Sequence, residues 1–516
     1  MRKNRRTTAV IAALAGLALA LTACGGGSPD SPDSTSGTET EPLTIALSRM
    51  FAGAWYPPTW NWSTYTPLQE ASYSGLIERA PGGEYVPSLA TEWSYDSPTA
   101  FRMKLREGVK FSDGEVFDAT AVKVNLEAAK DVVGPFTSAI ADLTEVEVVN
   151  DHEVVIHSSA VIPDLELILS QTLGLMVSPA AVKDLSLLEQ GPVGAGPYLL
   201  NVEESVAEDT YVFEKNPDYF DPGRVKFENL TIRVIPDAQA ASAAVQSGQV
   251  DISWARYQTV EASRAAGVNI LESLGTTLQL QFVDLAGDEF KALGDTKVRQ
   301  ALNYAIDREA IAENLSPGRV TSQFLNVASD GYLPELDDWY EYDPDKAREL
   351  LPEAGYADGF TFQVLSVPGN DEAALQAVAG YFKDVGVEME LVLKPIAEFV
   401  PSASAGEYAT TFSPSTSLGS AYLDLQPFIS PDGGKNNRQF VDQEMIDALD
   451  KAANTIDPQE RAQAYQEINK MISERAWFAV VQQSNVYYLY NDRVDELVEI
   501  PGYLFPTIRY LQPAAG

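Results

Sequence analysis

The sequence is poor in the two side chains that most often bind transition metals or form cross-links. Cys24 is the only cysteine among 516 residues, so no disulfide can form within the chain. His152 and His157 are the only histidines, in the stretch NDHEVVIHSS. Five residues apart in an alternating strand, they are expected to point to opposite faces of a sheet. The sequence therefore predicts no shared metal site and no cofactor.

Basic residues are also scarce, since 36 Lys and Arg accompany 74 Asp and Glu, for a formal net charge of -38. Four of the cations lie in the first six residues; without them 32 basic residues face 74 acidic ones, a balance of -42. Such a surface repels phosphate backbones and anionic headgroups, so we expect no nucleic-acid partner. The acidity is compatible with a cationic ligand, although solubility is the simpler explanation.

Long apolar runs are absent except at residues 9–20, which follow Arg2, Lys3, Arg5 and Arg6. That run has the length of an export signal and is short for a membrane span. The residues LTAC at 21–24 then resemble the lipobox of bacterial lipoproteins. The resemblance implies a signal peptide over residues 1–23 and a lipid anchor on Cys24, held at the membrane by its acyl chains. The alternative is an ordinary signal peptide with an incidental cysteine.

Residues 24–42 lack any apolar stripe and are rich in Gly, Ser, Pro, Asp and Thr, which predicts a flexible tether. The rest of the chain is too long for a single core, so two or more lobes are expected. Catalytic motifs are also missing: no G-x-S-x-G, H-E-x-x-H or S-x-x-K with its companions occurs where a nucleophile or metal site needs it. Paired carboxylates cannot be recognised from a count of acids alone. We therefore expect a protein that is not an enzyme.

The body alternates strand and helix patterns. FTFQVLSV (360–367) and VEMELVL (387–393) have period-two alternation, and LQAVAGYFKDVG (375–386) between them has helical spacing with Gly386 as a C-cap. This β-α-β unit predicts a parallel pair of strands. Two further helices are expected to begin after Asp343 and Asp457, each followed by proline. The predicted fold class is α/β, with mixed sheets and flanking helices.

Five phrases resemble the extracytoplasmic solute-binding proteins of family 5, the receptors of ABC importers for peptides, nickel and other solutes. They occur in the family's order, and the resemblance covers about residues 43 to 510. The phrases are the stretch 86–127 around KFSDGEVFDA, GAGPYLL with FEKNPDYF (194–220), SGQVDI (247–252), VRQALNYAIDREAI (298–311) and YDPDKARELLPEAGY (342–356).

The resemblance implies a two-lobed periplasmic-binding-protein-like fold of class II type, cluster C, with a hinge. Lobe one would be discontinuous, residues 43–276 with 485–516, and lobe two would be 277–484. A solute touching both lobes would stabilise the closed state and be delivered to permease and ATP-binding subunits. The protein is expected to be a monomer outside the cytoplasm, on the periplasmic side if a second membrane exists.

Candidate ligand-binding residues come from three stretches. The first stretch is predicted to be a loop, WYPPTWNWSTY (55–65). Its aromatic side chains either pack on their own lobe or line the cleft. Trp254 follows the short strand VDIS, where the ends of parallel strands face a cleft. The stretch 410–428 is rich in hydroxyl groups and in backbone donors. The candidates are Trp60, Asn61, Trp62, Tyr65, Trp254, Phe412, Ser413, Ser415, Tyr422 and Asp424.

The class of solute stays open between two alternatives. In the family, an Asp about three residues before the position of Asp424 often pairs with a peptide amine, and here that place falls near Ala421, between Ser420 and Tyr422. An ammonium without such a partner would be costly to desolvate. Peptide-like solutes are favoured by the family, whereas oligosaccharides suit the aromatic and hydroxyl side chains. A ligand-sensing lipoprotein without transport is the third alternative.

Overall fold

The computed structural model describes residues 42–49, 53–60, 62–132, 134, 137–369, 371–412, 414–417 and 419–515. The expected signal peptide, Cys24 and almost all of the expected tether lie outside these ranges. Within the described residues, no helix combines the length and the apolar character needed to cross a bilayer.

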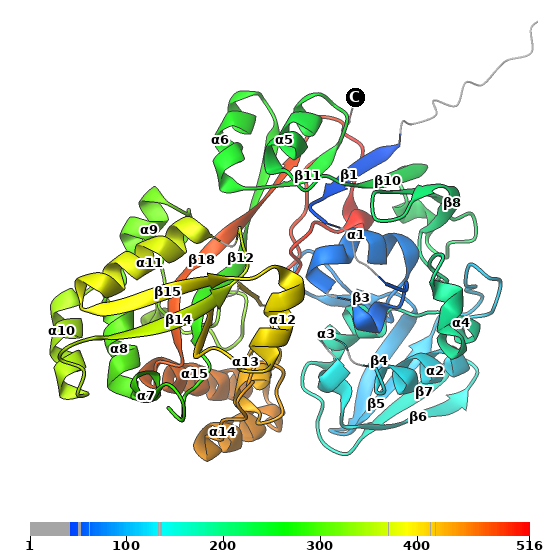
Figure 1. Cartoon of the computed structure of the whole chain (residues 1–516). Helices are drawn as coiled ribbons and strands as arrows, with labels where there is room; N and C mark the ends of the chain where they lie inside the picture. Colours follow the sequence, from blue (N-terminus) through cyan, green and yellow to red (C-terminus); the bar gives the residue numbers. More distant parts are fainter. Residues whose placement is uncertain are drawn as a thin grey trace, which may run out of the picture. The chain divides into compact units, whose positions relative to one another are not determined.

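The largest sheet extends through most of the described body, as Figure 1 shows. Its strands follow the order β15-β14-β16-β12-β18-β11-β1-β10-β9-β8, with β13 beside β18 and β17 beside β12. Parallel pairs (β1 with β10, β14 with β15) occur together with antiparallel ones, so the sheet is mixed, as predicted. The bounds are β1 Leu43–Leu47, β8 Tyr198–Val206, β9 Thr210–Lys215, β10 Asn229–Val234, β11 Ile252–Ala255, β12 Asn269–Phe282, β13 Gly318–Arg319, β14 Phe360–Ser366, β15 Val387–Leu393, β16 Thr410–Phe412, β17 Ser415–Thr416 and β18 Phe478–Tyr490.

Two long antiparallel strands, β12 and β18, link the two ends of this sheet. One end of β18 pairs with β11, and the opposite end of β12 pairs with β16. The register of the β12–β18 pair shifts between Leu274 and Thr276, so a bulge lies at Gly275. Gly275 is required there because a Cβ at this position would come within 2.3 Å of Val486 Cγ1.

Two smaller sheets complete the strands of the described residues. The strands β4 (Ala90–Ser97), β5 (Ala100–Leu105), β7 (Glu153–Ser158) and β6 (Leu143–Asn150) form an antiparallel sheet in that order, and β2 (Ile77–Arg79) pairs with β3 (Tyr85–Pro87). Helix α2 (Ala119–Ala129) packs on the four-stranded sheet and shares its apolar cluster. Asp118 caps α2, and Gly114 takes a positive φ of 89° in the turn before it. The stretch KFSDGEVFDA thus forms a turn that leads into a capped helix.

The predicted β-α-β unit is confirmed. Helix α11 (Glu372–Asp384) connects parallel strands β14 and β15, and Gly386 ends the connection with a φ of +90°. Asp343 and Asp457 cap α10 (Pro344–Glu353) and α15 (Pro458–Glu474) through their side chains. The other helices are α3 Leu165–Ser170, α4 Pro179–Lys183, α5 Ala238–Gln246, α6 Tyr257–Ala265, α7 Lys291–Gly294, α8 Thr296–Tyr304, α9 Arg308–Asn314, α12 Ile396–Ser404, α13 Ala421–Ile429 and α14 Gln443–Ala453.

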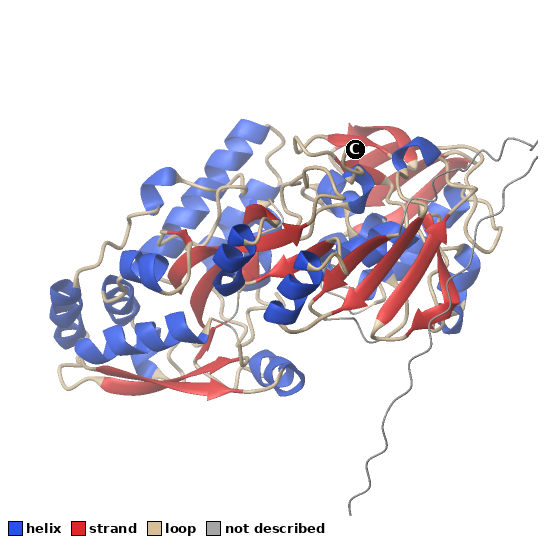
Figure 2. Cartoon of the chain, turned by 90° about the horizontal axis from the view of Figure 1, so that it is seen from above, coloured by secondary structure: helices blue, strands red, loops and turns tan. Residues whose placement is uncertain are grey.

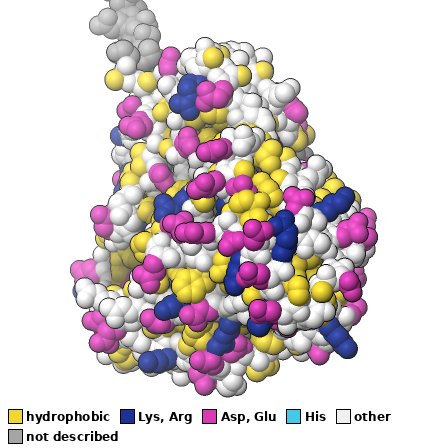
Figure 3. All heavy atoms as spheres, turned by 90° about the vertical axis from the view of Figure 1, so that its left-hand side faces the viewer, with side chains coloured by type: hydrophobic (Ala, Val, Ile, Leu, Met, Phe, Trp, Pro, Cys, Tyr) yellow, Lys and Arg dark blue, Asp and Glu magenta, His cyan; other side chains and the backbone are white. Residues whose placement is uncertain are grey.

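The buried apolar side chains form separate clusters, each on its own group of strands or helices. One cluster surrounds β1, β9 and β10 and includes residues from both ends of the described chain, such as Leu43 and Leu511. Other clusters lie under β14 and α11 and among α13, α14 and α15. Figure 2 shows helices beside the strands of the body. Carboxylates are scattered over the face drawn in Figure 3, with Lys and Arg among them, which agrees with solubility as the role of the acidic surface.

The prediction that residues 55–65 form a loop is wrong in part. Pro57–Thr59 is a short 3-10 helix, and α1 runs from Trp62 to Ser72. Pro67 is tolerated because the helix is kinked at Tyr65, whose φ and ψ are -116° and 17°, so Pro67 lies in the first turn of the second segment. Proline therefore interrupts the periodicity of this stretch without excluding helix.

Candidate functional site

A cavity with a volume of about 560 Å³ is bordered by α13 and by residues 414–417. We call it the Asp424 cavity. Thr277 of β12 and Phe324 also line this cavity. Gly134 and Ser138, which lie between α2 and β6, contribute from a segment far away in the sequence. The cavity is therefore lined by segments that lie far apart in the sequence.

Hydroxyl groups cover one wall of the Asp424 cavity. Ser415 is placed by β17, which pairs with β12 so that Ser415 faces Thr277. Gln279 Nε2 donates to Ser415 Oγ over 2.7 Å. Ser417 Oγ donates to Asp424 Oδ2 over 2.5 Å, which orients that carboxylate in the first turn of α13. Two of the predicted residues, Ser415 and Asp424, are thus brought to one cavity.

Aromatic rings form an apolar part of the lining. Phe324 and Phe428 both line the cavity, and their ring centroids are 5.2 Å apart at an interplanar angle of 77°. Phe324 also stacks on Phe478, with centroids 4.4 Å apart and an angle of 13°. The two lining rings are fixed by this packing and are suited to hold an apolar group.

The charged side chains around the Asp424 cavity are Asp424, Asp432 and Lys435. Desolvation by the surrounding protein lowers the pKa of the Lys435 ammonium below its usual 10.5. The Lys435 side chain is nevertheless exposed. Lys435 thus combines an exposed side chain with a place in the lining of the cavity. The cavity thus combines carboxylates, an ammonium, hydroxyl groups and aromatic rings.

A second cavity of about 350 Å³ adjoins the first, because Thr416 and Ser417 line both. Its other walls are residues 272–275, 326–328, 499 and 501–504. We call it the Tyr503 cavity. The C-terminal segment on this wall is held in place by Arg79 Nη1, which donates to Pro501 O over 2.7 Å. The two cavities together form a recess lined by segments that are far apart in the sequence.

The start of α13 contacts Asp164 and the four-stranded sheet beside this recess. Ser420 caps α13 by accepting from Leu423 N, and Ser420 Oγ donates to Asp164 Oδ2 over 2.5 Å. Leu423 packs against the apolar cluster of the four-stranded sheet. Ala421, at the place of the family's amine-binding Asp, is fully buried, and its N–H donates to Asp330 Oδ1 over 2.8 Å. This edge of the recess is closed by direct contacts.

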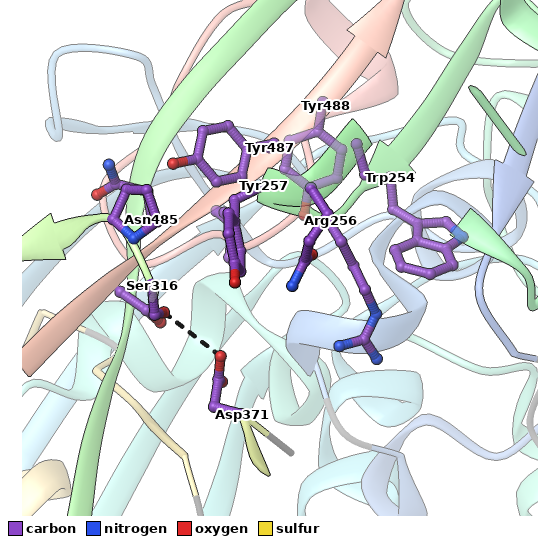
Figure 4. A pocket seen from close by; sticks show the side chains of 13 residues that line it. Trp254, Arg256, Tyr257, Ser316, Asp371, Asn485, Tyr487 and Tyr488 are labelled. Carbon is purple, nitrogen blue, oxygen red and sulfur yellow. Dashed lines mark hydrogen bonds between the residues drawn. The ribbon is translucent and has the colours of Figure 1, made fainter. Parts of the chain in front are cut away.

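A third cavity, of about 250 Å³, lies elsewhere and includes Trp254 (Figure 4). Trp254 Nε1 donates to Ile235 O over 3.1 Å, and the Arg256 guanidinium lies 5.9 Å from the Trp254 ring centroid. Opposite them, Ser316 Oγ donates to Asp371 Oδ1 over 3.4 Å, and burial raises the pKa of Asp371. Trp254 therefore shares no cavity with Ser415 and Asp424.

The remaining predicted residues have other positions. Trp60 is buried in the cluster around β1, where it packs against Trp55, and Phe412 is buried in β16, beside β12. Tyr65 and Tyr422 are half-buried beside apolar clusters. Burial raises the pKa of Tyr422 to about 12. In this structure Trp60 and Phe412 are core residues. Asn61, Ser413 and Cys24, and the side chain of Trp62, lie outside what the structure describes.

The sequence interpretation missed Phe324, Phe428 and Lys435. The only local signal for Lys435 is its position after Gly433 and Gly434, which indicates a turn and not a ligand. The two histidines show no metal-binding arrangement, since His152 precedes β7 and His157 Nε2 lies 2.9 Å from Glu147 Oε2. Among the described residues, no group of three or more His, Cys, Asp or Glu could hold a metal ion.

The chain is similar to known proteins both in sequence and in structure. The sequence profile of the bacterial extracellular solute-binding proteins, family 5 (middle region), matches residues 84–440. The glutathione-binding protein GsiB of Escherichia coli K12 is 28% identical over 411 residues, which cover 76% of this chain and 79% of that protein.

Solved structures share the fold at lower identity. A dipeptide-binding protein from Pseudoalteromonas sp. SM9913, in complex with Met-Leu, has a TM-score of 0.81 and 19% identity, covering 92% of this chain and all of that one. The periplasmic binding protein AgaA of A. tumefaciens R10, in complex with agropinic acid, has a TM-score of 0.78 and 22% identity, covering 92% of this chain and 99% of that one. The predicted periplasmic-binding-protein-like α/β fold is thus confirmed.

Proposed function

Because the chain belongs to the bacterial extracellular solute-binding proteins of family 5, we propose that it captures a peptide-like solute in the Asp424 cavity for an ABC importer. The observation that carries this proposal is the lining of the cavity. Phe324 and Phe428 offer an apolar wall, while Asp424, Lys435 and the hydroxyl group of Ser415 offer polar partners for both ends of a zwitterion. The dipeptide complex and the GsiB relative support the same class of solute.

We propose that capture occurs by closure of two lobes, residues 43–276 with 485–516 and residues 277–484. The bulge at Gly275 interrupts the β12–β18 ladder next to both proposed boundaries, which makes it the natural place for bending. Closure would be favoured by a solute that touches both lobes, because only the closed state supplies both sets of contacts.

An oligosaccharide is the second candidate solute, raised by the tryptophans of the sequence. The structure favours it less, because Trp60 is buried in a core and Trp254 lines a separate cavity. Within the described residues, no tryptophan lines the Asp424 cavity.

We also propose that Cys24 carries acyl chains that keep the receptor, a monomer, near its permease and ATP-binding subunits outside the cytoplasm. The support is the LTAC stretch behind an apolar run in the sequence. A ligand-sensing role without transport would use the same anchor, and a gene neighbourhood that encodes no permease would favour it.

A thermal-shift screen of peptide, oligosaccharide and metal-chelate libraries tests the class of solute. A solute at 100 times its dissociation constant adds about 2.7 kcal/mol to the free energy of unfolding. We expect peptides to raise the melting temperature and neutral oligosaccharides to leave it unchanged. Stabilisation by oligosaccharides alone would refute the proposal in favour of the second candidate.

A further inference from the structure

Lys435 is held rigidly at the wall of the Asp424 cavity. Its backbone N–H donates to Pro427 O over 2.9 Å, and its carbonyl accepts from Gln281 Nε2 over 2.7 Å. Gly433 allows this close turn, because a Cβ there would come within 2.4 Å of Pro427 O. The backbone is thus fixed, and only the side chain of Lys435 is left to adjust.

The turn is also anchored on the other side of Lys435. Asn436 is buried, and its Nδ2 donates to Ser430 O over 3.1 Å and to Phe440 O over 2.8 Å. These two bonds close the connection between α13 and α14 on both sides of the lysine. The contacts place the lysine at the cavity before any solute arrives.

The charge of Lys435 is not balanced by the protein. Among the described residues, no carboxylate oxygen lies within 4.0 Å of its ammonium. Asp424, the carboxylate on α13 that shares the cavity, is oriented by Ser417. Desolvation lowers the pKa of Lys435, and no neighbouring carboxylate opposes that effect. An anion that binds beside this ammonium would supply the opposite charge that the protein does not.

We propose that Lys435 recognises an anionic group, a carboxylate, of the solute that enters the Asp424 cavity. This inference rests on the proposed function and narrows it to acidic or free-carboxylate peptides. The carboxylate would lie at Lys435, an apolar part of the solute would pack on Phe324 and Phe428, and N–H or ammonium groups would face Asp424. A surface lysine kept only for solubility would need neither the cavity nor the anchored turn.

The first part of the test compares matched solutes on the wild-type protein. Isothermal titration calorimetry is carried out with a panel of short peptides, each as the free acid and as its C-terminal amide, and with glutathione and its diethyl ester. We expect the free acids to bind about 10- to 100-fold more tightly than the neutralised partners, the range of a hydrogen bond to a charged group.

The second part compares variants. Lys435→Met is expected to lose the preference for the free acid, whereas Lys435→Arg keeps a cation and retains most of it. Lys451→Met removes an exposed lysine of α14, and thereby the same net charge, without touching the cavity. Lys451→Met should bind the free acids and amides with the affinities of the wild type. This result would show that the lost preference for the free acid in Lys435→Met is not an effect of net charge. Melting temperatures measured without solute establish that each variant is folded.

A pH titration separates a direct contact from a structural role. The affinity of the wild type for the free acid should fall as pH rises through the lowered pKa of Lys435, because the ammonium is lost. Lys435→Arg should keep its affinity over that range, since a guanidinium stays charged. A structural role would give both proteins the same pH profile.

The outcomes separate this inference from the proposed function. If the wild type binds peptides and Lys435→Met binds acids and amides as the wild type does, the inference is overturned and the proposed function stands. If no member of the panel binds the wild type, peptide capture itself is overturned, and the inference falls with it.

Discussion

The bulge between β12 and β18 offers a sharp test of how closely the two linking strands pack. Gly275→Ala would place a Cβ 2.3 Å from Val486 Cγ1 and 3.3 Å from Val486 Cβ. The second atom cannot move away by rotation of the side chain, so the strands must separate or the bulge must change. Overpacking of this kind costs about 1–3 kcal/mol. We expect Gly275→Ala to lower the free energy of unfolding by an amount in that range.

Gly380→Ala is the matched control. Gly380 is exposed within α11, and a Cβ there meets nothing within 4 Å. The same substitution should therefore stabilise the protein by about 0.5–1 kcal/mol through helix propensity. Urea denaturation followed by tryptophan fluorescence measures both variants, and equal m-values would show that the unfolding transitions are comparable.

A double-mutant cycle then locates the strain. Val486→Ala alone truncates a half-buried side chain and should destabilise the protein. Combined with Gly275→Ala, it should relieve the clash with Cγ1, because that atom is removed. We expect a favourable coupling of at least about 0.5 kcal/mol between the two sites. Equal stability of Gly275→Ala and Gly380→Ala, or no coupling with Val486→Ala, would refute the close approach deduced for this bulge.

Three further predictions concern other parts of the chain. Cys24→Ser should move the protein from the detergent phase to the aqueous phase in a partition assay, and a membrane-bound variant would exclude the lipid anchor. Burial opposes ionisation of Asp284, but three backbone N–H groups and Arg438 outweigh the effect of burial and hold the pKa of Asp284 below 3.8. The ionised carboxylate therefore contributes to the free energy of unfolding above pH 3.8, and this contribution is lost as the pH falls through the pKa of the folded state. Asp284→Asn should thus be less stable at neutral pH and lose less stability on acidification; identical pH profiles in thermal melts would contradict this. Ser420→Ala removes the cap of α13 and the bond to Asp164, and should cost about 1 kcal/mol in urea denaturation; an unchanged midpoint would show that neither bond contributes.

Local elements were predictable because their signals are local. The alternation of Phe360 and Phe362, the helical spacing after them and the position of Gly386 are properties of a few neighbouring residues. Asp343 and Asp457 before proline likewise mark helix starts through a hydrogen bond that spans three residues. These features do not depend on what the rest of the chain does.

The candidate site was predictable only in part. Ser415 was named because its stretch is rich in hydroxyl groups, and Asp424 because the resemblance relates its position to the family's; both line the Asp424 cavity. Trp60 and Phe412 were named as aromatic or loop residues, and both are buried in cores. An aromatic side chain in an irregular stretch has the same sequence pattern whether it faces a cleft or a core, because burial depends on contacts with distant segments.

The sequence by itself determined the class of elements, their caps and the family, since periodicity, turn residues and motif order are all written along the chain. Only the tertiary structure decided which side chains share a cavity. Thr277, Phe324, Asp424 and Lys435 come from four separate segments, and they meet because β12 pairs with β17 and because the turn at Lys435 folds back on α13. That meeting depends on pairings and close contacts between residues distant in sequence, which no local pattern encodes.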